Sequence, residues 1–143
     1  MSEPWASLPG ALKEEISGCW PSVFPEGLPG WLAGDHVSEA DVAEAIARSL
    51  FLRQTLERHP EQIRPAVAAR PLTEPTTEAW LADRWRDYLQ GVDSEPALHA
   101  ALRQYRREIQ FRIIWRDLMN WADLNETMLA TSAFADVAID GAL

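Results

Sequence analysis

The sequence predicts an all-α fold: an irregular helical bundle of about five to six helices with a proline- and glycine-rich N-terminal segment. From Ser38 onward, apolar residues recur at the three- and four-residue spacing of amphipathic helices. No segment combines strict apolar-polar alternation with β-branched residues, and no Asn-Gly or Asp-Gly turn joins two such runs, so little or no sheet is expected. The 143 residues, 47% of them hydrophobic, are enough for one domain with a real core.

Residues 1–37 are expected to form an N-terminal segment with one short helix, because five prolines and five glycines interrupt them. The candidate helix runs from about Pro9 to Trp20. Leu12, Ile16 and Trp20 recur there at the i, i+4 and i+8 positions of one helical face. We expect the rest of the segment to wrap over the core as a loop.

Residues 38–143 are expected to form the helical domain, which begins with a helix from Ser38 to about His59. Ser38 can serve as the N-cap of this helix. Glu39 and Asp41 place negative charge in its first turn, where the helix dipole favours it. The positions that follow at helical spacing are Val42, Ala45, Ile46, Ser49, Leu52 and Leu56.

A proline-containing stretch follows this helix. Pro60 cannot continue the helix but suits the first position of a new one, so a short segment from Pro60 to Val67 is expected. Pro65 counts against this segment, because a proline inside a helix removes a backbone hydrogen bond. Residues 68–75 are expected to form a linker, because its two prolines push the residues before them toward extended conformations.

Two strongly amphipathic helices are predicted next. Thr76 or Thr77 caps the first of them, and Gly91 marks its C-terminal stop. Its stripe consists of Trp80, Leu81, Arg84, Trp85, Tyr88 and Leu89. Ser94 with Pro96 opens the second and longest helix. Its stripe consists of Leu98, Ala101, Leu102, Tyr105, Ile109 and Ile113. Further apolar residues on neighbouring faces indicate that this helix is the central post of the bundle.

The last predicted helix begins after Asp123 and reaches the C-terminus. Asp123 and Glu126 have the spacing of a capping box, with Asp in place of the usual Ser or Thr. The apolar pattern continues through Leu124 and Met128, and Gly141 is the only candidate stop signal. We therefore expect the chain to end within this helix.

Charge and cysteine content narrow the function classes. The formal net charge of -9 opposes a phosphate backbone, so nucleic acid is not an expected partner and a helix-turn-helix regulator is disfavoured. The N-terminus lacks signal-peptide features, and no apolar run approaches the roughly 20 residues of a membrane span, so no membrane is expected. The single cysteine, Cys19, cannot form an internal disulfide. We expect a cytoplasmic protein.

Residues with catalytic or metal-binding chemistry are few. His36, His59 and His99 lack the spacing of a metal site, and Cys19 has no histidine close in sequence to act as its base. The paired carboxylates are expected on solvated helix faces, where no burial raises their pKa. These pairs are Glu14 with Glu15 and Asp83 with Asp87. The sequence contains no phosphate-binding glycine loop and no Asp-x-Asp metal pair. We therefore assign no catalytic, cofactor-binding or metal-binding residue.

The most informative feature is the arginine cluster of the longest predicted helix. Residues 103–117 carry a net charge of +3, whereas the rest of the chain carries -12. The interpretation that we favour pairs these guanidiniums with the acidic helices around them. The alternative places some of them against a partner domain, or a phosphate bound by it, where bidentate contacts favour arginine. The candidate interdomain contact residues are Arg103, Arg106, Arg107, Arg112 and Arg116.

Two motifs in this helix are distinctive. A Leu-Arg-x-aromatic-Arg-Arg run is formed by Leu102, Arg103, Tyr105, Arg106 and Arg107. An Arg-Ile-x-x-x-Asp-Leu run is formed around Arg112, Ile113, Arg116, Asp117 and Leu118. Upstream, a helix-like stretch ends in His59, Pro60 and Glu61. With these motifs, residues 38–143 resemble the helical segment that precedes the first catalytic domain of glutamine synthetase adenylyltransferases.

The resemblance implies a bifunctional parent enzyme that regulates nitrogen assimilation. Such an enzyme uses Mg and phosphate to remove AMP from a tyrosine of glutamine synthetase, and uses ATP to add it at a second catalytic domain. It also implies control by glutamine and a PII signal protein. The family's Gly-Gly or Gly-Ser turn and its Asp-x-Asp metal pair do not occur in this sequence. We therefore expect an N-terminal fragment that ends before the adenylyl-removing nucleotidyltransferase domain and carries none of this chemistry.

Two functions follow as hypotheses. The first is a non-catalytic helical scaffold that packs against the adjacent nucleotidyltransferase domain of the parent chain. In this case, the arginine-rich helix and the last helix lie at or near the junction. The alternative is a docking module whose acidic surface binds glutamine synthetase or the PII signal protein.

Overall fold

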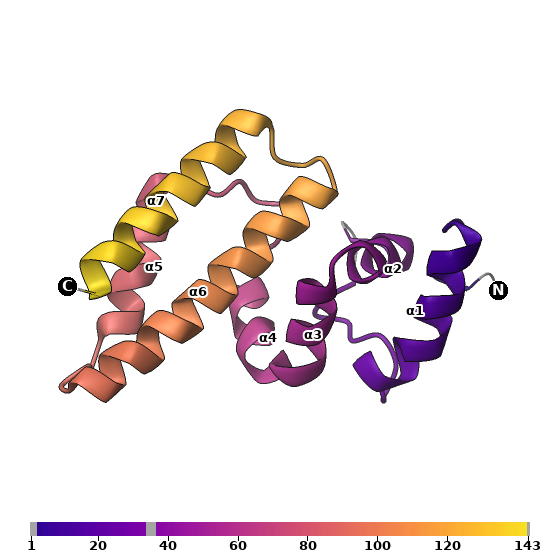
Figure 1. Ribbon diagram of the computed structural model, residues 1–143, viewed down its shortest axis with the longest axis horizontal. Helices are drawn as coiled ribbons and strands as arrows, with labels where there is room; N and C mark the ends of the chain where they lie inside the picture. The colour runs from indigo at the N-terminus through magenta and orange to yellow at the C-terminus, as the bar shows by residue number, and fades with distance from the viewer. Residues whose placement is uncertain (1–2, 34–36, 143) are drawn as a thin grey trace. The chain divides into compact units, whose positions relative to one another are not determined.

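The computed structural model describes residues 3–33 and 37–142, with the side chains of 137–142 left out of the description. Over these residues it contains seven α-helices and no strand, which confirms the all-α fold class (Figure 1). The helices are α1 (Gly10–Val23), α2 (Glu39–Arg48), α3 (Leu50–Arg58), α4 (Pro60–Ala69), α5 (Glu78–Leu89), α6 (Glu95–Leu118) and α7 (Leu124–Ala142).

The chain divides into two compact units, Met1–Thr73 and Glu74–Leu143. The first unit contains α1 to α4, and the second contains α5 to α7. Within the first unit, α1 packs against both α2 and α3. The division into an N-terminal segment and a helical domain at residue 37 stays a prediction.

One helix more than expected arises at Ser49, where the single helix predicted from Ser38 to His59 is broken into α2 and α3. That prediction was wrong at this position. Ser49 has extended backbone angles, φ -135° and ψ 110°, and its hydroxyl accepts a hydrogen bond of 3.2 Å from the backbone N–H of Leu52. A serine hydroxyl that satisfies a free N–H in this way begins a new helix. Ala45 and Leu52 remain buried on either side of the break, so the hydrophobic spacing gives no sign of it.

The predicted N-caps are confirmed by side-chain hydrogen bonds. Ser38 accepts from the N–H of Asp41 at 3.1 Å, and the Asp41 carboxylate accepts from the N–H of Ser38 at 3.1 Å, which completes a capping box. Thr77 caps α5 through the N–H of Trp80 at 3.2 Å. The analogous bonds at α6 and α7 come from Ser94 and Asp123.

In the second unit, a residue with a positive φ angle follows the end of both α5 and α6. Gly91, with φ 76°, follows the end of α5, as predicted. Asn120 adopts φ 58° after α6. Around it, the N–H of Trp121 donates to the carbonyl of Arg116 at 2.9 Å and the N–H of Asn120 donates to that of Asp117 at 3.1 Å. These two bonds form a Schellman motif, in which an asparagine takes the left-handed position usually held by glycine.

The core of the second unit is aromatic and draws on all three of its helices. Its buried centre consists of Leu81, Tyr105, Ile109 and Ala130. The ring of Tyr105 has neighbouring ring centroids at 5.0 Å in Trp85, 5.9 Å in Tyr88 and 5.9 Å in Phe134. Such ring pairs add to the stabilisation from burial alone. In the second unit, α5, α6 and α7 therefore pack against one another in pairs around one tyrosine.

Candidate functional site

The five arginines of α6 separate into two groups. Arg112 and Arg116, in the C-terminal half, are only 4% and 2% exposed. Arg103 and Arg106, in the N-terminal half, are exposed, and Arg107 is half-buried. The arginine cluster of α6 thus has a buried C-terminal part and an accessible N-terminal part.

Arg112 connects α6 to the segment that leads into α5. Its Nε donates to the hydroxyl of Thr76 at 2.9 Å, and its Nη2 donates to the backbone carbonyl of Glu74. The guanidinium carbon lies 5.0 Å from the ring centroid of Trp80, within the range of a cation–π contact. All three partners belong to the second unit, so Arg112 stabilises that unit from within.

Arg116 connects α6 to α7. Its Nε and Nη2 donate to the two carboxylate oxygens of Glu126 at 2.8 and 3.0 Å, and Nη2 also donates to the carbonyl of Trp121 at 3.0 Å. The bidentate geometry suits a guanidinium and not an ammonium group. An open depression of about 560 Å³ lies beside this ion pair and is bordered by residues 75–78, 120–123, 125 and 129. Its arginine is already neutralised by Glu126, as the favoured interpretation of the arginine cluster predicts.

A third buried bridge involves Glu108, which is 4% exposed. Its carboxylate accepts two hydrogen bonds of 2.7 Å from Arg84 and one of 2.6 Å from the hydroxyl of Tyr88. These bonds raise the pKa of the Arg84 guanidinium, against the opposing effect of burial. Arg84 also lies 3.7 Å from Asp87, one helical turn further along α5. The one sequence signal for the bridge is an acidic residue inside a basic run.

Tyr105 contributes a buried hydroxyl next to this bridge. The hydroxyl donates to the backbone carbonyl of Leu81 at 3.2 Å. Burial raises the pKa of the Tyr105 phenol to about 12, and the nearby Glu108 carboxylate adds to the shift. The phenol therefore stays neutral at physiological pH and serves the core.

The accessible half of α6 presents a small basic hollow. His99, Leu102, Arg103 and Arg106 line a space of about 220 Å³. These positions lie on one face of the helix, because they follow the i, i+3, i+4 and i+7 spacing. Of the predicted contact residues, Arg103 and Arg106 are therefore placed where a partner could reach them, while Arg112 and Arg116 are not.

An exposed apolar surface lies on α7. Leu124, Met128 and Leu129 are 75%, 60% and 45% exposed. Leu124 and Met128 are one helical turn apart and share a face of α7. In a small acidic chain, three large apolar side chains in water on one helix mark a surface that gains free energy when it is covered. We call these three residues the α7 apolar face.

The described residues do not fit the metal chemistry that the resemblance implies. Within residues 3–33 and 37–136, whose side chains are described, no three His, Cys, Asp or Glu side chains come close enough to hold a metal ion. His59 lies 3.7 Å from Glu61 and His99 lies 3.9 Å from Glu95, each a simple pair, and His36 falls outside the described residues. Cys19 accepts a hydrogen bond of 3.7 Å from Arg53. We therefore derive no step through Mg or ATP for this chain.

No helix among the described residues is both long and apolar enough to cross a membrane.

The structure thus defines an all-α segment whose buried charged groups in α6 are paired within the second unit, while a basic hollow and an apolar face of that unit are accessible. A family model described as glutamate-ammonia ligase adenylyltransferase matches residues 39–143. The chain belongs to this family, which confirms the resemblance drawn from the α6 motifs.

The individual proteins that the chain resembles carry names that match this family. The chain is 34% identical to the bifunctional glutamine synthetase adenylyltransferase/adenylyl-removing enzyme of Pseudomonas syringae pv. tomato over 115 residues, 80% of this chain and 12% of that protein. It is 33% identical to the protein of the same name from Nitrosomonas europaea over 106 residues, 71% of this chain and 11% of the relative. The chain thus spans about a tenth of the length of these curated relatives. No solved structure gives a significant match.

Proposed function

We propose that this chain is a non-catalytic helical scaffold of a glutamine synthetase adenylyltransferase that packs against the adenylyl-removing nucleotidyltransferase domain of the longer protein. The observation that carries the proposal is the α7 apolar face. Covering Leu124, Met128 and Leu129 removes apolar area from water at about 25 cal/mol per Å². We expect the α7 apolar face to be buried by the domain that follows this segment in the longer proteins of the family.

Two further observations support this scaffold. The buried bridges of Glu108 and Arg116 tie α6 to its neighbours, which keeps the surface of α7 in one geometry. Arg103 and Arg106 add exposed positive charge on α6, which suits an acidic or phosphate-bearing partner surface. The Mg and ATP of the parent reaction then belong to its catalytic domains. The proposed place of action is the cytoplasm.

A chimaera tests the scaffold. In the full-length Pseudomonas syringae relative, the matching segment is replaced by this chain, and removal of AMP from adenylylated glutamine synthetase is measured together with the melting temperature. Leu124→Ser with Met128→Ser should lower both values, because the uncovered junction no longer gains from apolar burial. Leu50→Ser is the matched control, since Leu50 is 55% exposed in the other unit.

Two results would contradict the scaffold. One is an unchanged melting temperature and activity in the α7 double variant. The other is phosphate-dependent release of ADP from adenylylated glutamine synthetase by the 143-residue chain alone.

The alternative function is direct docking of glutamine synthetase or a PII signal protein. The observation that favours it is the contrast between the net charge of -9 and the exposed Arg103 and Arg106, which gives the chain surfaces of both signs. Calorimetric titration of the chain against each purified protein separates the two proposals. Docking produces saturable heat, whereas a scaffold without its catalytic domain produces none.

A further inference from the structure

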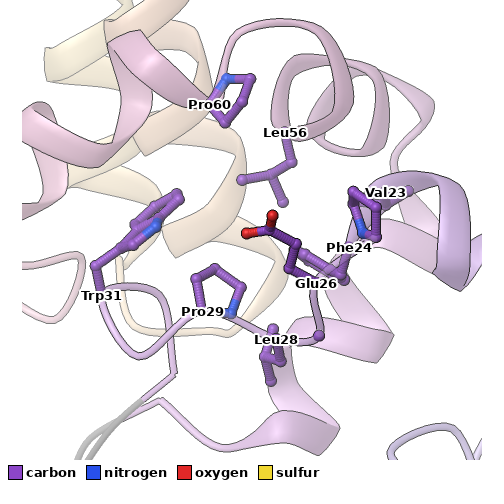
Figure 2. A pocket seen from close by; sticks show the side chains of 10 residues that line it. Val23, Phe24, Glu26, Leu28, Pro29, Trp31, Leu56 and Pro60 are labelled. Atoms are coloured by element: carbon purple, nitrogen blue, oxygen red, sulfur yellow. The ribbon is translucent and has the colours of Figure 1, made fainter.

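The first unit contains a hollow of about 300 Å³ that the proposed function does not use. It lies between the end of α1, the loop that follows it, and the facing ends of α3 and α4. The side chains that give it its chemistry are Phe24, Glu26, Leu28, Pro29, Trp31 and Leu56 (Figure 2). Its volume is at the lower end of the range for ligand pockets, which is enough for one large side chain.

The floor and walls of the hollow are formed before any ligand arrives. Phe24 and Leu56 are 6% and 2% exposed, and Trp20 packs against the ring of Phe24 at 4.8 Å between centroids. The loop turns at Gly27, whose N–H donates to the carbonyl of Phe24 at 3.0 Å and whose φ is 87°. A preformed site of this kind costs a ligand little ordering entropy.

Among the residues that the structure describes, Glu26 is the only charged one that lines this hollow. Figure 2 shows its carboxylate pointing toward the middle of the hollow, between Leu56 and Trp31. A carboxylate over an apolar floor repels anions, and a neutral apolar ligand would strip its water without replacing the hydrogen bonds. A cation on an apolar stem satisfies both parts of the site. Trp31 adds an aromatic ring beside the carboxylate, which suits a guanidinium.

From this geometry we infer that the hollow binds an arginine side chain of a partner polypeptide, with the guanidinium on Glu26 and the stem along Phe24 and Leu56. The charge of the unit agrees, because residues 1–73 carry ten acidic and six basic residues. Such a field attracts basic segments.

This inference is independent of the proposed scaffold. Eight of the ten lining residues precede residue 39, where the family match begins, and the α7 apolar face belongs to the other unit. If arginine binding in the hollow fails its test, the proposed scaffold can still be tested, and the reverse also holds.

The test is a nuclear magnetic resonance titration of the whole chain with the capped peptide acetyl-Leu-Arg-Leu-amide. Saturable shifts are expected for the Gly27 amide and for the Trp31 indole, whose signal a Trp31→Phe variant identifies among the seven tryptophans. Glu26→Gln should weaken binding about tenfold, because a charge-assisted contact is lost. Glu14→Gln removes another exposed carboxylate, one that does not line the hollow, and should leave binding unchanged.

Two comparison peptides test whether the hollow requires the charge and the planar shape of a guanidinium. The citrulline peptide keeps the shape and removes the charge, so it should bind about tenfold more weakly. The lysine peptide should also bind more weakly, because an ammonium lacks the planar face that stacks on a tryptophan. Absence of saturable shifts, equal binding of the citrulline or lysine peptide, or unchanged binding in Glu26→Gln would each overturn the inference.

Discussion

At the scale of single residues, the second unit is organised by buried polar groups whose partners lie far away in sequence. Glu108 accepts hydrogen bonds from Arg84 and Tyr88, which lie 24 and 20 positions upstream. Arg112 donates one to Thr76, which lies 36 positions upstream. A buried charge is tolerated only when partners replace its lost water. Removing one partner from such a buried pair therefore lowers the stability of the chain more than removing one partner from a surface pair.

The first prediction concerns the Glu108 bridge. Glu108→Gln should lower the free energy of unfolding by about 2–3 kcal/mol, because it leaves the Arg84 guanidinium without its buried counter-charge. Asp87→Asn is the control, since Asp87 contacts the same arginine but is 59% exposed, and it should cost less than about 0.5 kcal/mol. Denaturant unfolding measures both. Equal losses would show that burial does not set the strength of the bridge.

The second prediction concerns pH. The pKa of Tyr105 is about 12 in the folded chain, against 10.0 for an unperturbed tyrosine. Above pH 10 the unfolded chain loses this proton while the folded chain keeps it, so stability is complete below that pH and falls as pH rises toward 12. The free energy of unfolding should fall by up to about 1.4 kcal/mol per pH unit.

Denaturant midpoints measured across this alkaline range test the pH prediction. Tyr105→Phe should flatten the fall, although it also loses about 1 kcal/mol at neutral pH with the hydrogen bond to Leu81. A variant with the same alkaline slope as the natural chain would assign the effect to other groups.

At the scale of helices, local chemistry predicted where most elements begin and end. Ser38, Thr77 and Asp123 cap helices through bonds that span three residues, so the sequence alone carries the signal. The break at Ser49 was missed, because the apolar spacing continues across it and favours one long helix. The Glu108 bridge was missed for a related reason, since helical spacing does not report pairs between helices.

The third prediction concerns this break. Ser49→Ala should lower the free energy of unfolding by about 1 kcal/mol, because the N–H of Leu52 loses its cap. The matched control is Ser17→Ala in α1, where the hydroxyl donates to the carbonyl of Glu14 in an exposed position, and it should change stability by less than about 0.5 kcal/mol. Thermal unfolding followed by circular dichroism compares the two. If the two variants lose the same amount, Ser49 is not a functional cap.

At the scale of the whole molecule, the chain consists of two units with different accessible surfaces. The first carries the hollow at Glu26, and the second carries the α7 apolar face and the basic hollow. The sequence located the arginines of the basic hollow but not the hollow at Glu26. That hollow needs Leu56 and Pro60 to meet a loop some 30 positions upstream, a proximity that only tertiary folding creates.

The fourth prediction concerns the independence of the units. A chain of residues 74–143 should fold by itself with a cooperative thermal transition, because its ion pairs and aromatic centre are internal to it. Circular dichroism and the melting curve measure this. Glu108→Gln in the short chain should reduce stability as it does in the full chain. A spectrum without helical signal would show that the second unit depends on the first.

The division of α6 into a buried and an accessible half makes ionic strength a means of separating structure from recognition. Mobile ions screen exposed charges over about 10 Å at 0.1 M salt but reach shielded pairs poorly. Added salt should therefore weaken any association made through Arg103 and Arg106 while the contacts of Arg112 and Arg116 keep their strength. The contacts at one end of a single helix would thus be insensitive to salt, while the contacts at its other end would weaken as salt is added.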